Sequence, residues 1–224
     1  MTRTTAATRK LKPTLEQKLI IKHLQGHAMV DAGPGCAKTS TLALRVMHML
    51  KQGYEPSSIV ILTHGKALAA DIADTLSKFV DRDVAQQINV STIHSFAYRL
   101  VRKYHHLLEY DEVPIPLKQQ QKNLFIEHHA KLTGLKPADL KQAFSQYDAT
   151  YSKSAKVVEA LGKDKATLAR KAYIRYSRYK MNRNAVDFND MIKGAIKLLK
   201  LRPNSTLRGY EHLMVDDTSA HHDQ

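Results

Sequence analysis

The sequence predicts an α/β protein in which helices flank a parallel β-sheet and an all-helical insertion interrupts the sheet domain. Between residues 28 and 100, short apolar segments alternate with segments of helical periodicity, a pattern typical of parallel sheets. Residues 102–183 contain helical segments rich in Lys, Gln, Ala and Leu and no clear strand. A last apolar segment, 212–215, ends in two aspartates and is expected to return the chain to the sheet.

Composition excludes several classes of protein. The 224 residues are 43% hydrophobic and 25% charged, which is an ordinary globular mixture and argues against wholesale disorder. No apolar run approaches the ~18 to 20 residues of a membrane-spanning helix, and the basic N-terminus lacks the apolar stretch of a signal peptide. The single cysteine, Cys36, excludes an internal disulfide and fits a reducing cytoplasm, and no Cys/His set has zinc spacing.

The first elements surround a loop. Residues 1–12 are expected to be a flexible basic arm. Thr14 is predicted to cap a helix, because Gln17 lies at the third helical position and completes a capping box. The apolar run 28–30 is expected to be the first strand, and a loop from Asp31 to Ala37 follows it.

The remaining elements follow from periodicity. Apolar residues at Leu42, Val46, Met49 and Leu50 have helical spacing and predict a helix after the loop. The expected order is then a buried strand over 58–62, a helix over 69–80, a short strand over 88–90, a helix from about His94, the helical insertion, a helix over 187–201 that stops before Pro203, and the strand 212–215.

The segment Ala32-Gly33-Pro34-Gly35-Cys36-Ala37-Lys38-Thr39 is expected to bind phosphate. It follows a predicted strand and opens a predicted helix, which is where a Walker A phosphate loop belongs. Glycines let backbone N–H groups turn towards phosphate oxygens, and the helix N-terminus adds partial positive charge. Lys38 would reach the β- and γ-phosphates, and the Thr39 hydroxyl would bind Mg²⁺.

This loop departs from the strict pattern Gly-x4-Gly-Lys-Ser/Thr. Both outer glycines are alanines, Ala32 and Ala37. The Ala37 methyl group lies next to Lys38, where backbone and phosphate approach closely, and we expect weakened nucleotide affinity. The alternative is an ordinary Gly/Pro turn before a helix.

The two aspartates after the last predicted strand are expected to act together with the phosphate-binding loop. Asp216 would hold Mg²⁺ as a Walker B residue, and Asp217 is the candidate general base for the attacking water. The alternative is a strand-terminating turn.

Basic residues exceed acidic ones by 35 to 21, a net charge of +14 that favours a polyanionic partner. Between residues 151 and 202 there are 14 Lys/Arg and 4 Asp/Glu, with Tyr173, Tyr176, Tyr179 and Phe188 interleaved. Such cations bind phosphates and such rings stack on bases. The alternative is a solvated helical face whose rings pack inward.

Five segments in order resemble the motifs of the UvrD/Rep-like superfamily 1 DNA helicases. They are Thr14-Leu15-Glu16-Gln17, Ala32 to Thr39, Leu62 to Ala69, Val90-Ser91-Thr92-Ile93-His94-Ser95-Phe96 and Val186 to Ile192. The resemblance implies a first P-loop, RecA-like ATP-binding domain (1A) at 13–101 and 184–224, and a helical insertion (1B) at 102–183.

The resemblance also implies ATP and Mg²⁺ as cofactors and single-stranded DNA, or a single-strand/duplex junction, as partner. Gln17 would read the adenine edge. The implied nucleotide-binding residues are Gln17, Ala32, Gly33, Pro34, Gly35, Cys36, Ala37, Lys38, Thr39 and Ser40. The implied DNA-binding residues are Thr63, Lys66, Thr92 and His94.

Two departures from the family's pattern limit the expected activity. The family's acidic motif is usually Asp-Glu-x-Gln-Asp, whereas this chain has Asp216-Asp217-Thr218-Ser219-Ala220, and a shorter carboxylate is poorly placed to reach the water. The second RecA-like domain, with its phosphate-stabilising arginines, is not in the sequence, so a second chain or C-terminal half would have to supply it.

The interpretation of the chain as the ATP-binding part of a helicase, with weak or no turnover by itself, has two alternatives. One is a non-catalytic nucleic-acid-binding protein derived from a helicase. The other, a small-molecule P-loop kinase, explains neither residues 92–96 nor the basic insertion.

Overall fold

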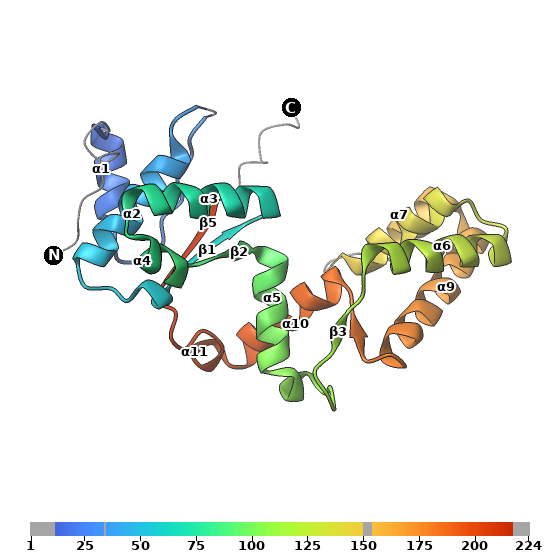
Figure 1. Cartoon of the computed structure of the whole chain (residues 1–224). Coiled ribbons are helices and arrows are strands. Elements are labelled where there is room, and N and C mark those ends of the chain that lie inside the picture. Colours follow the sequence, from blue (N-terminus) through green and yellow to red (C-terminus); the bar gives the residue numbers. More distant parts are fainter. Residues whose placement is uncertain (1–11, 34, 150–153, 217–224) are drawn as a thin grey trace. The chain divides into compact units, whose positions relative to one another are not determined.

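The computed structural model of the chain describes residues 12–33, 35–149 and 154–216. The described residues form two compact units. One contains the chain up to Phe96 and from Leu207 onward, and the other contains Ala97–Thr206 (Figure 1). Among the described residues, no helix combines the length and apolar character needed to cross a lipid bilayer.

The first unit is built on a parallel three-stranded sheet. Its strands are β1 (Ile59–Thr63), β2 (Asn89–Thr92) and β5 (His212–Asp216), in the order β2-β1-β5. In the register, Thr63 of β1 pairs with Thr92 of β2 and with Asp216 of β5. The last residues of the three strands therefore form one row at the carboxyl edge of the sheet. The predicted α/β fold with a parallel sheet is confirmed.

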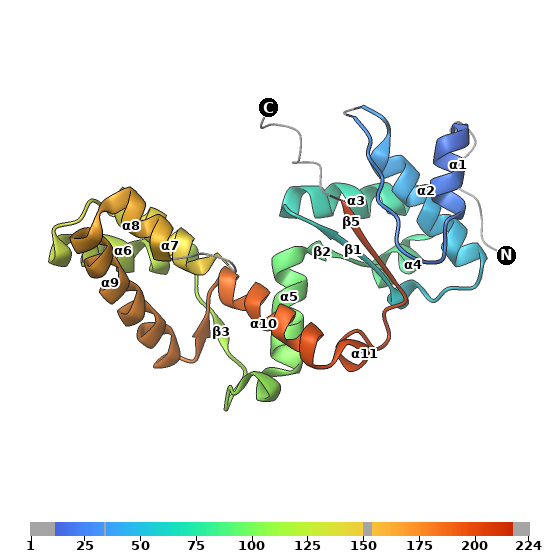
Figure 2. The ribbon, with the colours of Figure 1, turned by 180° about the vertical axis from the view of Figure 1, so that it is seen from behind.

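Helices cover one face of this sheet (Figure 2). The unit contains α1 (Leu15–Lys22), α2 (Lys38–Lys51), a 3₁₀ turn η2 (Pro56–Ser58), α3 (Lys66–Phe79), α4 (Arg82–Gln87) and the start of α5 (Ile93–Lys103). The core joins α2, α3 and the sheet through buried side chains: Ala43, Val46, Met49, Ile59, Ile61, Ile72, Leu76, Phe79 and Ile88. Because Ile59 and Ile61 are two residues apart, they point to the same face of β1, and α2 and α3 pack on that face.

The strand expected at residues 28–30 is not present. The segment has no strand conformation, and the side chains of Met29 and Val30 are 95% and 49% exposed. A strand forms only where its N–H and C=O groups enter a ladder with a neighbouring strand. Three apolar residues supply β propensity but no ladder, so tertiary context overrides the local signal.

The second unit is mainly helical. It contains η3 (His105–Leu108), β3 (Ile115–Pro116), α6 (Gln119–Thr133), α7 (Pro137–Asp148), α8 (Ser154–Leu161), α9 (Lys163–Met181), β4 (Ala185–Val186), α10 (Phe188–Leu201) and α11 (Pro203–Thr206). Its core is separate from that of the first unit and includes Leu140, Phe144 and Tyr176. The sequence showed no strand in 102–183, whereas β3 lies there and pairs in parallel with β4. The expected boundaries of the 1A and 1B domains stay a prediction.

A buried polar network fixes the start of α10. Asp187 caps the helix, because its Oδ1 accepts hydrogen bonds from the N–H groups of Asn189 and Asp190 at 3.0 Å each. Its Oδ2 faces the ammonium groups of Lys180 at 3.3 Å and Lys122 at 3.4 Å. Burial alone would raise the pKa of Asp187, but the charges of Lys180 and Lys122 outweigh it and hold the pKa at about 2.

The same network binds neighbouring helices to α10. Lys122 of α6 also pairs with Asp148 of α7 at 2.7 Å, and Lys180 of α9 pairs with Asp190 at 2.6 Å. Burial lowers the pKa of Lys122, but its hydrogen bond and charge interactions with Asp148 and Asp187 raise the pKa above its ordinary value. Four helices therefore meet at one set of paired charges.

Two of the interleaved tyrosines pack inward, as the alternative interpretation of the basic stretch expects. Tyr176 is fully buried, and its hydroxyl donates to Asp187 Oδ2 at 3.0 Å. The half-buried Tyr173 donates its hydroxyl to Asp148 Oδ1 at 2.8 Å. Burial, together with these carboxylates, raises the pKa of both phenols, so they stay neutral hydrogen-bond donors. By contrast, Phe188 is 46% exposed.

Candidate nucleotide-binding site

The backbone of the loop before α2 has left-handed turns at two positions. Gly35 has φ of 78° and Ala37 has φ of 53°. Ala37 is the N-cap residue of α2 and makes no side-chain hydrogen bond to the first turn, and that turn contains no acidic residue. Successive N–H groups around such a turn form a concave site that suits an anion, and the helix N-terminus adds partial positive charge. These features suit an anion, and binding of phosphate by the loop stays a prediction.

Lys38 folds back over this loop. Its Nζ donates a hydrogen bond to the carbonyl oxygen of Ala32 at 2.8 Å. This hydrogen bond connects the two ends of the loop. The side chain is half-buried, and Thr39 and Ser40 follow it in the first turn of α2, also half-buried. The ammonium group is thus held at the Ala32 carbonyl, at the start of the loop.

The predicted capping box of α1 is confirmed, and it brings Gln17 to the loop. The Thr14 side chain accepts from Gln17 N at 3.2 Å, and Gln17 Oε1 accepts from Thr14 N at 3.0 Å. Gln17 Nε2 donates to the carbonyl oxygen of Cys36 at 3.4 Å. Arg45 of α2 donates to the Ile20 carbonyl at the end of α1, so α1 is fixed to the helix that follows the loop.

Asp216 lies on the sheet face that α2 covers. Met214 of β5 packs against the core that α2 and α3 form with the sheet. Because side chains two residues apart on a strand point to the same face, Asp216 is directed to that face as well. The helix that begins at Lys38 and the side chain of Asp216 therefore lie on the same side of the sheet. Pro34 and Asp217 lie outside the described residues.

Four residues predicted to contact DNA lie at the ends of β1 and β2 or just after them. Thr63 and Thr92 pair in the register and are buried, with exposed fractions of 0% and 8%. The Thr92 hydroxyl lies 2.8 Å from the Ser95 hydroxyl and accepts from Ser95 N at 3.1 Å, so it helps to cap α5. Lys66 is exposed at the start of α3, and His94 is half-buried. Their contact with DNA stays a prediction.

Sequence reasoning did not single out His64, which belongs to the same edge. Burial lowers the pKa of His94, and the charge of His64 lowers it further, so the two rings are close enough to interact. His64 follows the last residue of β1, and His94 follows the last residue of β2 by two positions. Their positions after neighbouring parallel strands are the signal that could have linked them.

The parallel sheet, the loop and the helix that begins at Lys38 define the chain as an α/β protein of the P-loop NTPase-like class. Residues 14–219 match the family described as UvrD/REP helicase N-terminal domain. The match covers most of the chain, which therefore belongs to this family.

Curated helicases are similar over most of the chain. The ATP-dependent DNA helicase PcrA of Leuconostoc citreum is 27% identical over 221 residues, and the ATP-dependent DNA helicase UvrD1 of Mycobacterium leprae is 24% identical over 219 residues. Each match covers 90% of this chain and 28% of the helicase. A probable DNA helicase of Mycoplasma pneumoniae is 22% identical over 202 residues, 83% of this chain and 37% of that helicase. The chain thus spans well under half the length of each of these relatives.

Proposed function

We propose that the chain is the ATP-binding part of a UvrD-like DNA helicase, which in the complete enzyme couples ATP hydrolysis to movement along single-stranded DNA and to duplex unwinding. The observation that carries the proposal is the left-handed loop at the start of α2, with Lys38 folded over it and Asp216 directed to the same side of the sheet. Relatives with helicase names over 90% of the chain support it.

Each predicted site residue has a role in this proposal. The loop 32–37 and the first turn of α2 would receive the phosphates, with Lys38 neutralising their charge. Thr39 and Asp216 would hold Mg²⁺, Gln17 would contact the adenine, and Asp217 would act as a weak base. Bound ATP–Mg²⁺ supplies the phosphoryl group whose transfer to water releases the free energy for movement.

The carboxyl edge of the sheet would face the DNA strand through Thr63, Lys66, Thr92 and His94. Turnover and stepping need a second RecA-like domain, from another chain or a C-terminal half, because closure of two domains completes the catalytic site. We therefore propose that unwinding requires residues 1–224 together with such a domain. A cytoplasmic location fits its single cysteine.

A non-catalytic nucleic-acid-binding protein derived from a helicase is the second candidate. The observation that favours it is Ala37, which holds a left-handed conformation where glycine has no steric cost. The aspartate at position 217 also gives the catalytic water a shorter acid. Both changes weaken catalysis more than they weaken DNA binding.

Nucleotide binding tests the proposal. In a titration with a fluorescent ATP analogue and Mg²⁺, Lys38→Ala is expected to weaken affinity about tenfold or more, because a charge-assisted contact to phosphate is worth ~1.5–3 kcal/mol. Lys51→Ala removes an exposed lysine at the end of the same helix and is the matched control, expected to bind normally. Equal affinity in wild type and Lys38→Ala would contradict the assignment of the loop.

Turnover separates the two candidates. DNA-stimulated ATP hydrolysis that Lys38→Ala abolishes identifies an enzyme, including a slow one. Salt-sensitive DNA binding with no hydrolysis, measured with and without added partner domain, identifies the binding protein.

A further inference from the structure

A groove between α1 and α2 of the sheet unit has aliphatic walls and a rim of cations. Its volume is about 200 Å³. This volume lies below the ~300–1,000 Å³ typical of small-molecule pockets, so the groove suits side chains of a protein partner better than a cofactor. Its lining residues are Pro13, Lys18, Ile21, Lys22, Leu44, Met47, His48 and Lys51.

The apolar part of the groove consists of half-buried side chains. They are Ile21 of α1 and Leu44 and Met47 of α2. The methylene stems of the lining lysines extend this carbon surface, while their ammonium groups stay in water. Met47 is unbranched and adapts to the shape of an entering side chain. The groove therefore offers apolar surface that the described residues leave partly exposed to water.

Apolar surface continues from the groove over α1. No residue of this helix is fully buried, and Leu15 and Leu19 are 78% and 72% exposed. Because residues three or four positions apart are neighbours on a helix, these leucines share a face of α1 with Lys18 and Lys22 of the groove. An apolar patch of several side chains beside a groove is typical of a protein-binding surface.

The cations at the rim have no carboxylate partner among the residues that the structure describes. Lys18, Lys22 and Lys51 are exposed, and none of them forms an ion pair there. In the sequences of α1 and α2 the single acidic residue is Glu16, which does not line the groove. The electrostatic potential at the groove is therefore positive, and it attracts an acidic partner.

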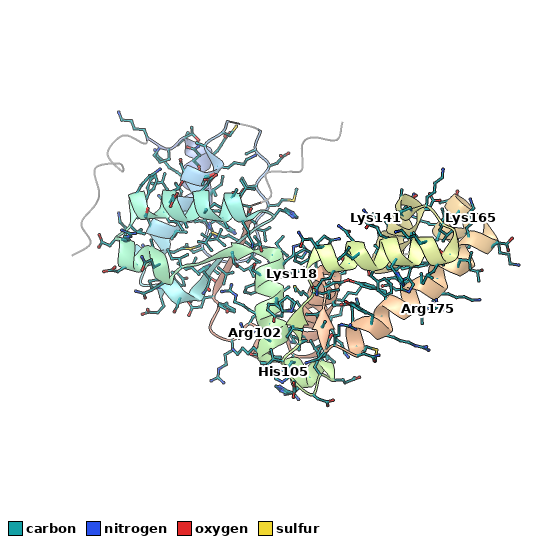
Figure 3. The ribbon with its side chains drawn as sticks, turned by 45° about the vertical axis from the view of Figure 1, so that its right-hand side comes forward. Arg102, His105, Lys118, Lys141, Lys165 and Arg175 are labelled. Carbon is teal, nitrogen blue, oxygen red and sulfur yellow. The ribbon has the colours of Figure 1, made fainter. Side chains whose placement is uncertain are left out.

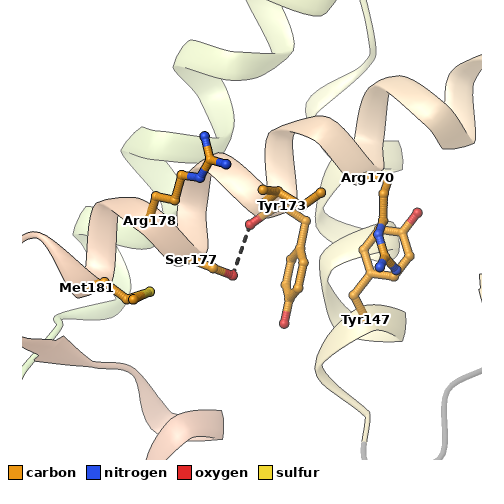
Figure 4. A pocket seen from close by; sticks show the side chains of 7 residues that line it. Tyr147, Arg170, Tyr173, Ser177, Arg178 and Met181 are labelled. Atoms are coloured by element: carbon orange, nitrogen blue, oxygen red, sulfur yellow. Dashed lines mark hydrogen bonds between the residues drawn. The ribbon is translucent and has the colours of Figure 1, made fainter. Parts of the chain in front are cut away.

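Exposed cations are common on this chain, so charge alone does not identify a site. On the helical unit, Lys141, Lys165 and Arg175 are exposed as well (Figure 3). A hollow between α7 and α9 of that unit is lined by tyrosine rings and arginines (Figure 4). The groove between α1 and α2 differs because its lysines border aliphatic side chains. An apolar centre with a charged rim is the surface that an apolar anchor with flanking carboxylates fits.

We propose that the groove between α1 and α2 docks an acidic amphipathic helix of a protein partner. Aliphatic side chains one turn apart on that helix enter the groove, and carboxylates beside them pair with Lys18, Lys22 and Lys51. Lys18 and Lys22 are ~6 Å apart along the axis of α1, the same rise that separates carboxylates four residues apart on a second helix. This inference goes beyond the proposed function and requires neither ATP nor DNA.

The chemistry of the groove favours this occupant over other polymers. A nucleic acid would use the lysines, but the lining contains no tyrosine, phenylalanine or tryptophan on which bases could stack. The first eleven residues of this chain include Arg3, Arg9 and Lys10 and no acidic residue, so like charges oppose their entry. An extended peptide needs the free edge of a sheet, whereas a groove between two helices receives a helix.

Selection from a displayed peptide library tests the chemistry that the groove accepts. The peptides are alanine-rich helices of about 14 residues, or about four turns. Two central positions one turn apart vary among Leu, Met and Ser, and the flanking positions vary among Glu, Gln and Lys. Selection on the full chain is expected to enrich Leu or Met at the centre and Glu at the flanks. Enrichment of Lys, or no enrichment, would overturn the proposal.

Substitutions in the groove locate the binding of the enriched peptide, labelled with fluorescein and followed by anisotropy. Lys18→Glu/Lys22→Glu is expected to weaken binding about tenfold at low salt and less at high salt, because it replaces attraction by repulsion. Met47→Gln is expected to weaken binding about threefold at every salt concentration, because it removes apolar contact and no charge.

The matched control is Lys78→Glu/Arg82→Glu, which makes the same charge change at exposed positions of the sheet unit outside the groove. It is expected to change affinity less than about twofold, and circular dichroism checks that every variant is folded. Equal losses in the two double variants would overturn the site and leave a general effect of net charge.

A peptide with exchanged charges separates a lost contact from a damaged fold. With Lys in place of each Glu, the peptide is expected to bind Lys18→Glu/Lys22→Glu more tightly than it binds the wild type. Failure of this rescue in a folded variant would contradict the proposed pairing.

Competition distinguishes the acidic helix from other anionic partners. Displacement of the peptide by an oligodeoxythymidylate or by phosphatidylserine vesicles, as effectively as by unlabelled peptide, would overturn the choice of a protein partner. Lys38→Ala is expected to bind the peptide as the wild type does. The groove and the nucleotide loop can therefore fail independently of each other in these experiments.

Discussion

A left-handed alanine is the most informative single residue of the nucleotide loop. Ala37 has φ of 53° and ψ of 38°, a conformation that costs an L-residue with a side chain ~1–2 kcal/mol. The strain falls on the residue whose N–H group and neighbours would surround a phosphate. The sequence comparison with the Gly-Lys-Thr pattern identified the position, and the backbone angle gives the physical reason why glycine suits it.

Restoring glycine at this position should increase the affinity of the loop for nucleotide. Ala37→Gly is expected to tighten ATP–Mg²⁺ binding several-fold, because the backbone then reaches the left-handed conformation without a steric penalty. The free energy of unfolding should change by less than ~1 kcal/mol, since the relief of strain offsets the greater entropy of the unfolded glycine chain. Calorimetric titration and urea unfolding measure the two effects, and an unchanged affinity would contradict this account.

Local chemistry explains which site contacts the sequence could predict. The Thr14–Gln17 capping box depends on residues three positions apart, and the structure confirms it. The contact of Gln17 with Cys36 and the interaction of His64 with His94 join residues 19 and 30 positions apart. Such contacts depend on how elements pack, which no local pattern encodes.

At the scale of elements, the start of α10 is the best-defined structural junction. Asp187 combines two tasks, because one carboxylate oxygen caps the helix and the other faces the buried Lys180 and the half-buried Lys122. The sequence presented this aspartate as part of a helicase-like motif. The structure gives it a stabilising role within the helical unit.

A substitution that removes the charge of Asp187 but keeps the helix cap separates these two tasks. Asp187→Asn keeps a side chain that caps helices well but leaves Lys122 and Lys180 short of a partner. Lys122 keeps its pair with Asp148, and Lys180 keeps its pair with Asp190. We therefore expect a loss of ~1–3 kcal/mol in the free energy of unfolding, the cost of weakening hydrogen bonds to charged groups. Urea unfolding followed by circular dichroism measures it. Asp164→Asn, at an exposed site of α9, is the control and should change stability by less than ~0.5 kcal/mol.

A buried histidine gives the helical unit a pH dependence. His129 of α6 stacks on Phe125 with ring centroids 3.9 Å apart, and burial lowers its pKa despite a hydrogen bond to the Phe125 carbonyl. The folded state therefore binds its proton less readily than the unfolded chain. This contribution to stability is complete above pH 6.5 and is lost as the pH falls below that value.

Thermal unfolding between pH 7.5 and 5 checks this sign. His129→Phe should flatten the dependence of Tm on pH, because the replacement ring stacks without titrating. His106→Phe changes an exposed histidine of the same unit and should leave the slope as in wild type. A slope unaffected by His129→Phe would show that other groups cause the acid sensitivity.

At the scale of the whole molecule, the described residues form two separate hydrophobic cores. The alternation of strands and helices predicted the sheet unit well, since β1, β2 and β5 all lie within a residue or two of their expected positions. The prediction of a strand at 28–30 was wrong because a β-strand forms only beside a neighbouring strand that hydrogen-bonds to it. The short helix α4 and the small β3–β4 pair were missed because they have too few residues for a periodic signal.

Because the two units have separate cores, a destabilising substitution in one core should leave the stability of the other unit unchanged. Leu140→Ala removes a fully buried side chain of the helical unit and is expected to cost ~2–5 kcal/mol there. Hydrogen exchange should then accelerate in α6, α7 and α9 and stay unchanged in β1 and α2. Ile72→Ala in the sheet unit should give the opposite pattern. Uniform acceleration in either variant would mean that the two units unfold as one.

Strand β5, at one edge of the sheet, affects how the protein behaves in solution. Among the described residues β5 pairs with β1 alone, and Leu213 and Val215 are 47% and 55% exposed on its face. An unpaired main-chain ladder beside apolar side chains attracts any other extended peptide, including a copy of itself. Solutions of this chain should therefore scatter more light as they are concentrated, and a lysine in place of Val215 should delay that turbidity.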